Sequence, residues 1–479
     1  MIETHISWVI LTGDFAYKIK RPIRLPFVDY REPAARRFYC EEELRLNRRF
    51  APELYLGVST ITRSPDRLQM DGGGVVCDYA VRMRQFASAD ELGRLLQHDQ
   101  VQPDELTRFG RELWAVHRGI VPAAAAPRFE RWRELLAENA RQCVDVLRDP
   151  ALRQRAAACG AGLATAATAL QPLFEARAAA GCARECHGDL HISNVARIGG
   201  RLVAFDALEF DPGFRLMDVA QEVAFLSMDL CTHGYVAHGA AFLNGWLAAS
   251  GDYPACELLN VCEAHWALVR AKVLEIAGAH ARVDRFLAHA EQRLHPARPR
   301  LILMHGWSGS GKSWVAGQLS QLLPAVWIRS DVERYRVVSH AADAPGEDAV
   351  AAGAYSPANV AAVYRHLGAM AAHALRGGRS VIVDASFLAR AQRAEFARLA
   401  VAQGASLAVI ACEAPEAVLR ARIGKRQRLG ADASEAGVDV LRWQQTTGQA
   451  IATDERLPVI HVRTDQEDAL DQALRQLHA

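Results

Sequence analysis

The sequence predicts two successive domains, an α+β domain followed by an α/β domain with a doubly wound parallel sheet. In the first part of the chain, strand-like runs come early and a long helical region follows, which is typical of α+β folds. Beyond about residue 297, strand-like and helical segments alternate, which is typical of a parallel sheet covered on both faces.

Composition narrows the class of protein. The chain has 479 residues, of which 50% are hydrophobic and 23% are charged, as in globular domains. A formal net charge of +1 provides no overall field that would attract nucleic acid or an anionic membrane. The ten cysteines contain no C-x-x-C pair, the N-terminus does not resemble a signal peptide, and no run approaches the roughly 20 apolar residues of a membrane span. We expect a cytoplasmic protein with no membrane partner.

The first domain is expected to cover residues 1–294. Two β-rich runs flank a Gly-Asp turn, and two further runs flank the segment MDGGG, so both pairs are typical of hairpins. The expected elements are strands at 7–14, 15–20, 55–64, 75–83, 195–198 and 201–206, a helix at 41–52, and helices over about 88–180 and 216–293.

The second domain is expected to cover residues 299–479. HPARPR (295–300) is typical of a linker, because its prolines end a helix and a new apolar strand begins at once. The expected elements are strands at 301–305, 325–328, 380–383 and 406–411 and helices at 311–323, 357–376 and 390–403.

The motif GWSGSGKS (306–313) matches G-x-x-x-x-G-K-[ST] between an apolar strand and an amphipathic helix, which is the context that this phosphate-binding loop requires. Its backbone N–H groups and the helix N-terminus favour phosphate, its lysine would reach the β- and γ-phosphates, and its last hydroxyl would hold Mg²⁺. The predicted cradle for ATP or GTP comprises Gly306, Ser308, Gly309, Ser310, Gly311, Lys312 and Ser313.

Other polar residues of the second domain allow two interpretations. Asp331 could accept the proton of an acceptor hydroxyl and Arg334 could bind substrate, but the pair is also typical of a helix N-cap and a solvated arginine. Asp384 ends a strand, a position suited to a metal-bound water. Arg422 and Arg426 lie one turn apart and could close over the triphosphate, although charged runs are commonly solvated helix faces.

The order of the P-loop, D-x-x-R (331–334), VIVDASF (381–387), Arg393 and an arginine-rich helix resembles the polynucleotide kinase and zeta-toxin group of P-loop kinases. This resemblance covers most of residues 299–479. It implies that Asp331 is the general base and that Arg334 and Arg393 help to bind substrate.

The segment HGDLHISN (187–194) has two interpretations. Cys182 and Cys186 precede it and suggest a zinc site, but no second pair of ligands follows at the usual spacing. Asp189 and Asn194 have the separation found in the kinase loop H-R-D-x-x-x-x-N, and Asp206 follows a short hairpin. Phosphoryl transfer needs this trio, one carboxylate for the hydroxyl proton and an Asn and an Asp for Mg²⁺, so we favour it.

The pattern H-G-D-x-H-x-x-N, continued by FDALEFDPGFRLMDVAQEVAFL, resembles the aminoglycoside phosphotransferase and choline kinase family. The resemblance implies a two-lobed, protein-kinase-like domain. In it, Lys18 would pair with the α/β-phosphates, Glu43 (or Glu42) would be its helix partner, and Asp218 would brace the catalytic loop. FDALEF stands where the related kinases have DFG, and no glycine-rich loop precedes Lys18, so the turn at residues 4–7 is the candidate cover for the phosphates.

Together the two halves resemble a bacterial fusion of an aminoglycoside-phosphotransferase-like domain with a P-loop kinase domain labelled AAA. The function expected is an ATP- and Mg²⁺-dependent phosphotransferase with two nucleotide sites that act on hydroxyl groups of small molecules. A kinase for nucleic-acid 5′-hydroxyls is an alternative that we do not favour, because the second domain shows no basic groove interleaved with aromatic residues. A nucleotide-dependent regulator without enzymatic activity is the third alternative.

Four acidic residues near the first motif could hold a cationic acceptor, or could be helix caps and solvated side chains, which we favour. They are Glu209, Asp211, Glu222 and Asp229.

Overall fold

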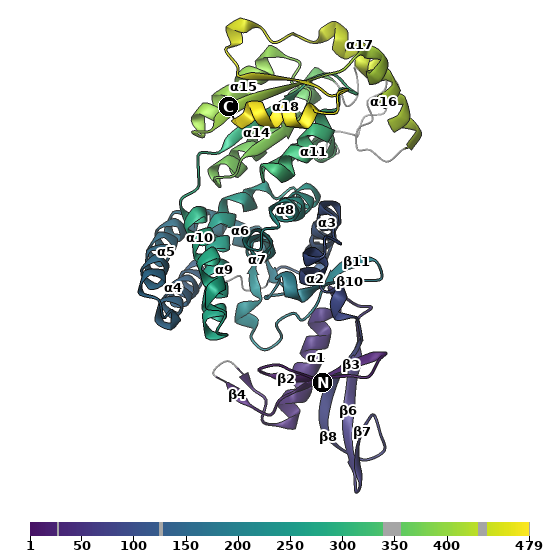
Figure 1. Ribbon diagram of the computed structural model, residues 1–479, viewed down its shortest axis with the longest axis vertical. Coiled ribbons are helices and arrows are strands. Elements are labelled where there is room, and N and C mark those ends of the chain that lie inside the picture. The colour runs from purple at the N-terminus through teal and green to yellow at the C-terminus, as the bar shows by residue number, and fades with distance from the viewer. Residues whose placement is uncertain (26–27, 124–127, 339–355, 430–437, 479) are drawn as a thin grey trace. The chain divides into compact units, whose positions relative to one another are not determined.

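The computed structural model describes residues 1–25, 28–123, 128–338, 356–429 and 438–478 (Figure 1). By its internal contacts the chain divides into two compact units. The first comprises Met1–Tyr235 and Cys262–Ala290, and the second comprises Val236–Val261 and Glu291–Ala479. The predicted fold class is confirmed, since the first unit joins an antiparallel sheet to a helical lobe and the second contains a parallel sheet.

A six-stranded antiparallel sheet opens the first unit, with the strand order β1-β2-β3-β8-β6-β7. Its strands are β1 (Ile2–Glu3), β2 (Ser7–Leu11), β3 (Phe15–Lys20), β6 (Tyr55–Ser64), β7 (Arg67–Met70) and β8 (Val75–Arg84), and β4 (Arg24–Leu25) pairs separately with β5 (Val28–Asp29). The sequence pattern does not indicate the edge strand β7, because this strand is short and has no buried face.

Helix α1 (Pro33–Asn47) packs against β6 and β8. It begins well before residue 41, where its composition placed the start. Pro33 supplies the helical φ of the first turn, and Arg36 is buried where its guanidinium bonds to Asp78 and to the carbonyl oxygen of Tyr30. A buried, paired arginine is invisible to hydrophobic periodicity, which explains the early part of the helix that the sequence missed.

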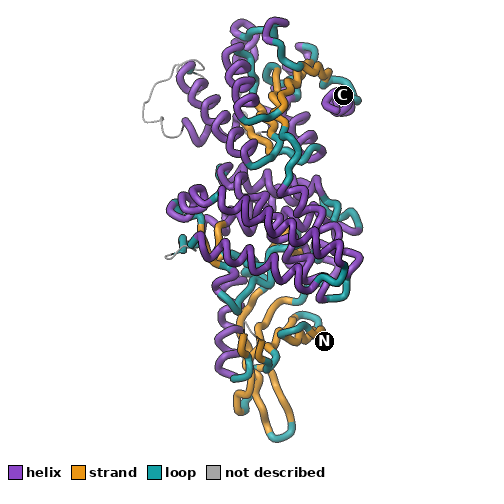
Figure 2. Tube along the Cα trace, turned by 90° about the vertical axis from the view of Figure 1, so that its left-hand side faces the viewer, coloured by secondary structure: helices purple, strands orange, loops and turns teal. Residues whose placement is uncertain are grey.

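The helical lobe follows the sheet, and Figure 2 distinguishes its helices from the strands by colour. Its elements are η1 (Ser88–Asp90), α2 (Leu92–Gln97), α3 (Pro103–Gly119), α4 (Phe129–Val146), α5 (Pro150–Ala169), α6 (Gln171–Ala179), α7 (Val219–Thr232), most of α9 (Cys256–Ile276), η5 (His280–Arg282) and most of α10 (Val283–Leu294). No single helix in the described ranges is long and apolar enough to cross a membrane, whereas α5 and α6, bent by 57°, reach that length and composition only as a pair.

Two small antiparallel pairs carry the first motif. Strand β9 (Ala183–Glu185) pairs with β12 (Leu216–Asp218), and β10 (Val195–Ile198) pairs with β11 (Arg201–Ala204). HGDLHISN lies between β9 and β10 and ends in η2 (Ile192–Asn194), while FDALEF follows β11 and leads to η3 (Pro212–Phe214). The register pairs Val195 with Ala204, so the end of the motif lies beside the start of FDALEF.

The second unit contains a five-stranded parallel sheet in the order β14-β15-β13-β16-β17. Its strands are β13 (Arg300–His305), β14 (Val326–Arg329), β15 (Val381–Asp384), β16 (Ser406–Glu413) and β17 (Val459–Arg463). Its helices include α11 (Lys312–Leu322), α12 (Ser330–Val338), α14 (Pro357–Arg376), α15 (Arg390–Ala402), α16 (Glu416–Leu429), α17 (Val438–Thr447), η6 (Thr453–Glu455) and α18 (Ala469–His478). The strands and helices expected in this unit are present. Strands such as VIVD are fully buried, so they could be predicted from the sequence as short apolar runs.

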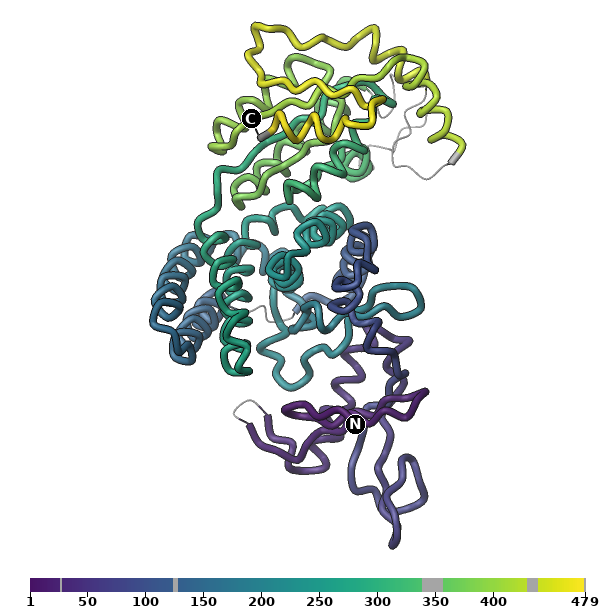
Figure 3. The backbone as a smooth tube through the Cα atoms, viewed as in Figure 1, coloured from purple at the N-terminus to yellow at the C-terminus, as the bar shows by residue number. Residues whose placement is uncertain are grey.

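The segment Val236–Val261 belongs to the second unit although its neighbours on both sides belong to the first. It forms α8 (Val236–Ser250), η4 (Tyr253–Ala255) and the start of α9, and its course can be followed in Figure 3. Asn244 of α8 donates to the carbonyl oxygen of Ala325 at 2.9 Å and accepts from the backbone N–H of Trp327 at 2.8 Å, so α8 is bonded to strand β14. The sequence placed this segment in a first domain of residues 1–294, and both predicted boundaries, 1–294 and 299–479, stay predictions.

Candidate active sites

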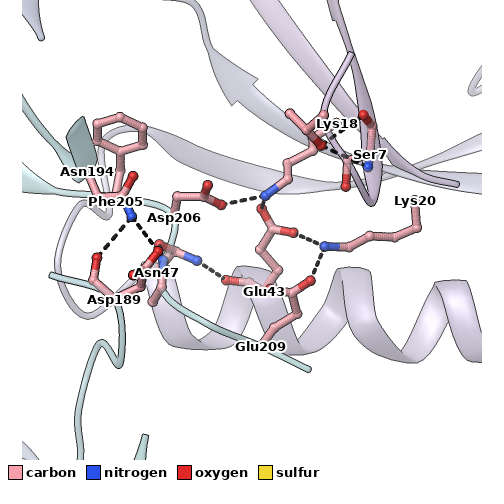
Figure 4. Close-up of polar contacts among 12 residues, drawn as sticks. Ser7, Lys18, Lys20, Glu43, Asn47, Asp189, Asn194, Phe205, Asp206 and Glu209 are labelled. Atoms are coloured by element: carbon pink, nitrogen blue, oxygen red, sulfur yellow. Dashed lines mark hydrogen bonds and ion pairs between the residues drawn. The ribbon is translucent and has the colours of Figure 1, made fainter. Parts of the chain in front are cut away.

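Strand β3 and helix α1 bring Lys18 and Glu43 together. Side chains two residues apart on a strand share a face, so Lys18 and Lys20 both point towards α1, as Figure 4 shows. Lys18 Nζ lies 2.9 Å from Glu43 Oε1 and 2.5 Å from Asp206 Oδ1. Burial opposes the charge on Lys18, but Asp206 and Glu43 outweigh it and hold its pKa well above the ordinary value. The lysine is therefore a fixed cation next to Asp206.

Lys20 extends this network beyond what the sequence suggested. Its ammonium is fully buried and contacts Glu43 and Glu209, and the hydroxyl of Tyr30 donates to Glu209 at 2.8 Å (Figure 4). Burial alone would raise the pKa of Glu209, but Lys20 and Lys18 lower it to about 2. Glu209 is thus an ionised partner within the protein, and it is neither the helix cap nor the solvated side chain that we favoured for this acid. The sequence signal that could have indicated this network is Lys20 itself, the second lysine of YKIK, two positions after Lys18.

The catalytic loop holds Asp189 in a defined position. The Asn194 amide donates to the Asp189 carbonyl oxygen at 2.9 Å and to its Oδ2 at 3.0 Å, and His191 Nε2 lies 3.5 Å from the same Oδ2. Burial works against ionisation of Asp189, yet His191, His187 and Arg270 lower its pKa below the ordinary value. The Asp189 side chain remains 42% exposed, so an ionised carboxylate can meet a molecule from solution.

The histidines of the motif orient the loop. His187 is fully buried, its pKa is lowered by burial, and its Nε2 donates to the Phe205 carbonyl oxygen at 2.9 Å. Its Nδ1 accepts the N–H of Asp189 at 3.3 Å, so both ring nitrogens of a neutral imidazole are used. Glu222 accepts the N–H groups of His187 and Gly188. Because both ring nitrogens of His187 are used in these contacts, His187 is not available as a ligand for the zinc site that the sequence suggested as an alternative.

Metal-ligating atoms do gather at His117, Cys186 and Glu222, all of which are buried. His117 Nε2 and Glu222 Oε2 are 2.5 Å apart, a hydrogen-bond separation, and burial raises the pKa of the Cys186 thiol well above its ordinary value. Glu222 also accepts the N–H groups of His187 and Gly188, so the His117–Glu222 pair braces the loop.

Asp206 is placed by its neighbours in the sheet lobe. Its backbone is in the left-handed region, with φ of 64°, and its N–H donates to the Tyr55 hydroxyl at 3.0 Å. The next N–H, of Ala207, donates to Asn47 at the end of α1 at 2.8 Å. Asp206 thus lies close to Asn194 in Figure 4, with the Lys18 ammonium on its other side.

Asp218 does not brace the loop in the way that the resemblance implied. Its carboxylate binds Arg177 through two bonds of 2.8 Å and caps α7 at the Ala220 N–H. The loop is instead held by Glu222 and by Asp229, whose Oδ2 accepts the N–H of Ile192 at 3.0 Å.

In the second unit, the P-loop leads from β13 into α11. Gly306, Gly309 and Gly311 have φ of 140°, 81° and 86°, a region in which only glycine is unstrained, and this lets the loop curl. Lys312 Nζ donates to the Trp307 carbonyl oxygen at 2.8 Å. Burial lowers the pKa of Lys312 and raises that of Asp384, and the Ser313 hydroxyl bonds to Asp384.

A cavity of about 290 Å³ collects the predicted groups of the second site. Its lining combines residues of the P-loop and of α12, the end of β15 and α16, namely Ser308, Gly309, Gly311, Lys312, Ser313, Asp331, Arg334, Asp384, Arg422 and Arg426. The predicted cradle residues Gly306 and Ser310 line a neighbouring cavity instead. Asp331 and Arg334 are 3.7 Å apart. Arg422 donates to Thr464 and Gly309, and Arg426 donates to the Ser308 hydroxyl at 3.2 Å, so both arginines contact the loop.

The structure corrects the role predicted for Arg393. The resemblance implied a substrate contact, but the guanidinium is fully buried and forms a bidentate pair with Glu455 at 2.7 and 2.8 Å. It also donates to the carbonyl oxygens of Phe387, Gln449 and Ala450, so all its donors serve the fold. An arginine near the start of a helix after the third strand looks the same in sequence whether it faces a ligand or a loop.

Two further residues of the second site carried no recognisable signal. Gln444 of α17 accepts the Ser308 N–H at 2.7 Å, and the Trp327 indole N–H lies 3.3 Å from Asp384 Oδ2. Both act from elements distant in the sequence, so only the fold brings them to the P-loop.

The chain is similar to the following known proteins. An uncharacterised protein of Mycobacterium tuberculosis is 29% identical over 471 residues, covering 94% of this chain and 91% of its own. Among solved structures, an aminoglycoside 2′-phosphotransferase-IIIa (15% identity, TM-score 0.37) matches 62% of this chain and 91% of its own. A Sinorhizobium meliloti gluconokinase (22% identity, TM-score 0.26) matches 38% and 92%.

Residues 301–451 match the family model described as an AAA domain, and this range begins in β13 and includes the whole P-loop. The Lys18–Glu43 pair and the loop of Asp189 and Asn194 lie in the sheet lobe and helical lobe of the first unit. The predicted resemblance is confirmed in this form: a kinase-like two-lobed fold is followed by a P-loop domain of the AAA-labelled type.

Proposed function

We propose that the chain is an ATP-dependent phosphotransferase with two sites, each of which transfers the γ-phosphoryl group to a hydroxyl of a small molecule. The observation that carries this proposal is the assembled state of the first site. Lys18 binds Glu43 and Asp206, and Asn194 holds Asp189, so five residues from four separate segments form two bonded groups. The two groups are neighbours, because the N–H of Phe205, next to Asp206, donates to the Asn194 carbonyl oxygen.

At the first site, Asp189 would accept the proton of the acceptor hydroxyl as that oxygen forms a bond to the γ-phosphorus. The bond between the γ-phosphorus and the β–γ bridging oxygen breaks, and ADP leaves. Lys18 is a protonated lysine that would neutralise the phosphates. The Asp206 carboxylate and the Asn194 amide oxygen are hard oxygen ligands, so their chemistry fits Mg²⁺, which would neutralise phosphate charge when bound.

At the second site the same bonds would form and break, with Asp331 accepting the proton. Gly306, Ser308, Gly309, Ser310, Gly311 and Lys312 would cradle the phosphates, and Arg422 and Arg426 would close over them. Asp384 and the Ser313 hydroxyl are oxygen groups suited to hold Mg²⁺ and its water. Arg334 remains the proposed substrate contact.

The test uses the full chain and γ-labelled ATP with a pool of small cellular metabolites. Asp189→Asn and Asp331→Asn each keep the size of the side chain but remove the base, so each should lower one labelled product about 100-fold or more. Asp104→Asn and Asp471→Asn, exposed acids in the first turns of α3 and α18, are matched controls that should keep both products.

If the wild-type chain binds ATP but labels no product, the chain is a nucleotide-dependent binding protein and this proposal fails. If both base variants label the same products at the wild-type rate, Asp189 and Asp331 are not the bases. Loss of one product only in Asp331→Asn, with none that depends on Asp189, would restrict the activity to the P-loop site.

A further inference from the structure

The acidic residues near Asp189 are already occupied by the protein. Glu209 pairs with Lys20, Glu222 holds loop amides and His117, and Asp229 accepts the Ile192 N–H. These three carboxylates are at most 4% exposed. These three cannot form a cradle for a cationic acceptor, and the fourth predicted acid, Asp211, caps η3 by accepting the Gly213 N–H.

Cations, in contrast, gather on the same side of the catalytic loop. His191 lies against Phe225, and Phe225 stacks on Trp266 of α9 at 4.2 Å between ring centroids. Arg270 follows Trp266 by one helical turn, so both lie on the same face of α9. Arg270 Nε is 3.7 Å from Asp229 Oδ1, and its charge is close enough to lower the pKa of Asp189.

Arg285, in the first turn of α10, adds a second cation, and η5 adds Arg282, which bonds to His233 at 2.9 Å. Burial and the charges of Arg282 and Arg270 lower the pKa of Arg285, whereas Asp229 is the one acid that raises it. The cluster therefore has three guanidinium groups around a single carboxylate.

Several of these donors have no hydrogen-bond partner, although Arg270 Nε keeps its ion-pair contact with Asp229. Arg270 Nε, Arg285 Nε and Arg285 Nη2 are buried nitrogen atoms without a hydrogen-bond partner. Buried donors of this kind are costly in a folded protein and usually have a role. An oxyanion presents several acceptors to a guanidinium fork at once, so it would satisfy them and relieve the repulsion.

A structural role as a helix cap is the competing explanation, because cations are favoured at the C-terminus of α7. That terminus is already closed by backbone bonds from His233, Gly234 and Tyr235 to the carbonyl oxygens of the last turn. His233 Nδ1 also bonds to the Asp229 carbonyl oxygen at 2.7 Å. The unpartnered nitrogen atoms of Arg270 and Arg285 are not used for capping.

We propose that the acceptor of the first site is an anionic hydroxyl compound whose phosphate or carboxylate group binds Arg270 and Arg285 while its hydroxyl faces Asp189. This inference rests on the proposed phosphotransferase function of the first site. It assigns the substrate class, an oxyanion-bearing alcohol, and makes the two arginines the residues that select it.

The first measurement follows phosphate transfer by the full chain with Lys312→Ala, which disables the P-loop site. Metabolites are separated beforehand into cationic, neutral and anionic pools. We expect labelled product from the anionic pool, and we expect Arg270→Gln and Arg285→Gln to raise its KM roughly tenfold or more with a smaller change in kcat. Arg131→Gln, an exposed residue of α4 paired with Glu134, is the control that should leave KM unchanged.

Product from the cationic or neutral pool alone, or an unchanged KM in both arginine variants, would overturn the inference. Absence of product from every pool would instead reject the phosphotransferase function, and a second measurement then decides about the anion site. Inorganic phosphate, compared with chloride at equal ionic strength, should raise the Tm of the Lys312→Ala chain. The same rise in the Arg285→Gln and Arg270→Gln chains would refute an oxyanion site there.

A third readout separates binding from folding. Because Arg285 has unpartnered nitrogen atoms and like charges beside it, Arg285→Gln should leave Tm unchanged or raise it in the absence of phosphate. A clear fall in Tm would show that the arginine serves the fold, and would contradict the assignment.

Discussion

At the scale of single residues, Lys20 explains how Glu43 is held in the first site. Lys18 alone would have to hold Glu43 and Asp206, but Lys20 takes the second oxygen of Glu43 and ties it to Glu209. Strand β3, helix α1 and the segment after Asp206 are therefore fixed by one buried network.

Lys20→Met should damage this network strongly. Removing one partner of a buried ion pair leaves uncompensated charge, which costs roughly 3–5 kcal/mol of stability. It should also weaken ATP binding at the first site about tenfold, because Glu43 loses the contact that fixes it for Lys18. Urea unfolding and ATP titration in the Lys312→Ala background measure the two effects.

Arg37→Gln is the control for Lys20→Met, since Arg37 lies on the same helix in an exposed pair with Glu41, and such pairs contribute about 0–1 kcal/mol. Equal effects in the two variants would mean that the buried network has no special role.

Arg393 and Glu455 make the stability of the second unit depend on pH. Their hydrogen bond lowers the pKa of Glu455 from its usual 4.5 to about 2 in the folded state. A depressed carboxyl pKa stabilises fully above the unfolded value and is lost as pH falls through the folded one. The Tm difference between wild type and Glu455→Gln should therefore be large at pH 6 and shrink between pH 4.5 and 2. A difference that stays constant across that window would contradict the pair's role.

At the scale of elements, helix α8 acts as a support for the P-loop site. Asn244 binds both sides of residue 326 in β14, and Trp327 of that strand donates to Asp384. The position of β14 thus helps to fix the orientation of the Asp384 carboxylate. The helix is apolar on most of its surface, so its sequence pattern does not show which sheet it joins.

Asn244→Ala should remove two buried hydrogen bonds and leave two backbone groups unpaired, a loss of roughly 2–3 kcal/mol in the second unit. The product that depends on Asp331 should decline at limiting Mg²⁺, whereas the product that depends on Asp189 should not. Val236→Ala, an exposed position at the start of the same helix, serves as the comparison. Loss of both products in equal measure would argue against a local effect.

Elements and motifs could be predicted from the sequence where they depend on residues close together in the chain. The P-loop glycines, the spacing of Asp189 and Asn194, and the buried strands of the second unit are all short-range signals. Arg393 was misjudged, because its role depends on Glu455, a residue 62 positions away. Lys20, Asn244 and the arginines near Asp229 were missed for the same reason, since long-range pairing leaves no periodicity in the chain, and Glu222 was named without its role as an acceptor for the loop.

At the scale of the whole molecule, a fragment of residues 299–479 would contain every P-loop motif but would lack Val236–Val261. Without α8, the groups of β14 that Asn244 satisfies become unpaired, and Glu333 loses the Tyr253 hydroxyl. We expect this fragment to be less stable than the same unit in the full chain and to bind ATP more weakly. Hydrogen exchange of the β14 amides compares the two. Equal protection in fragment and full chain would show that α8 is dispensable.

The assignment of Val236–Val261 also bears on how such a gene can change over generations. Because a part of the second unit is encoded between two parts of the first, no single breakpoint separates the two units into complete halves. Splitting the gene at any one point would leave at least one of the two products incomplete. Inheritance as one reading frame is therefore favoured by the path of the chain.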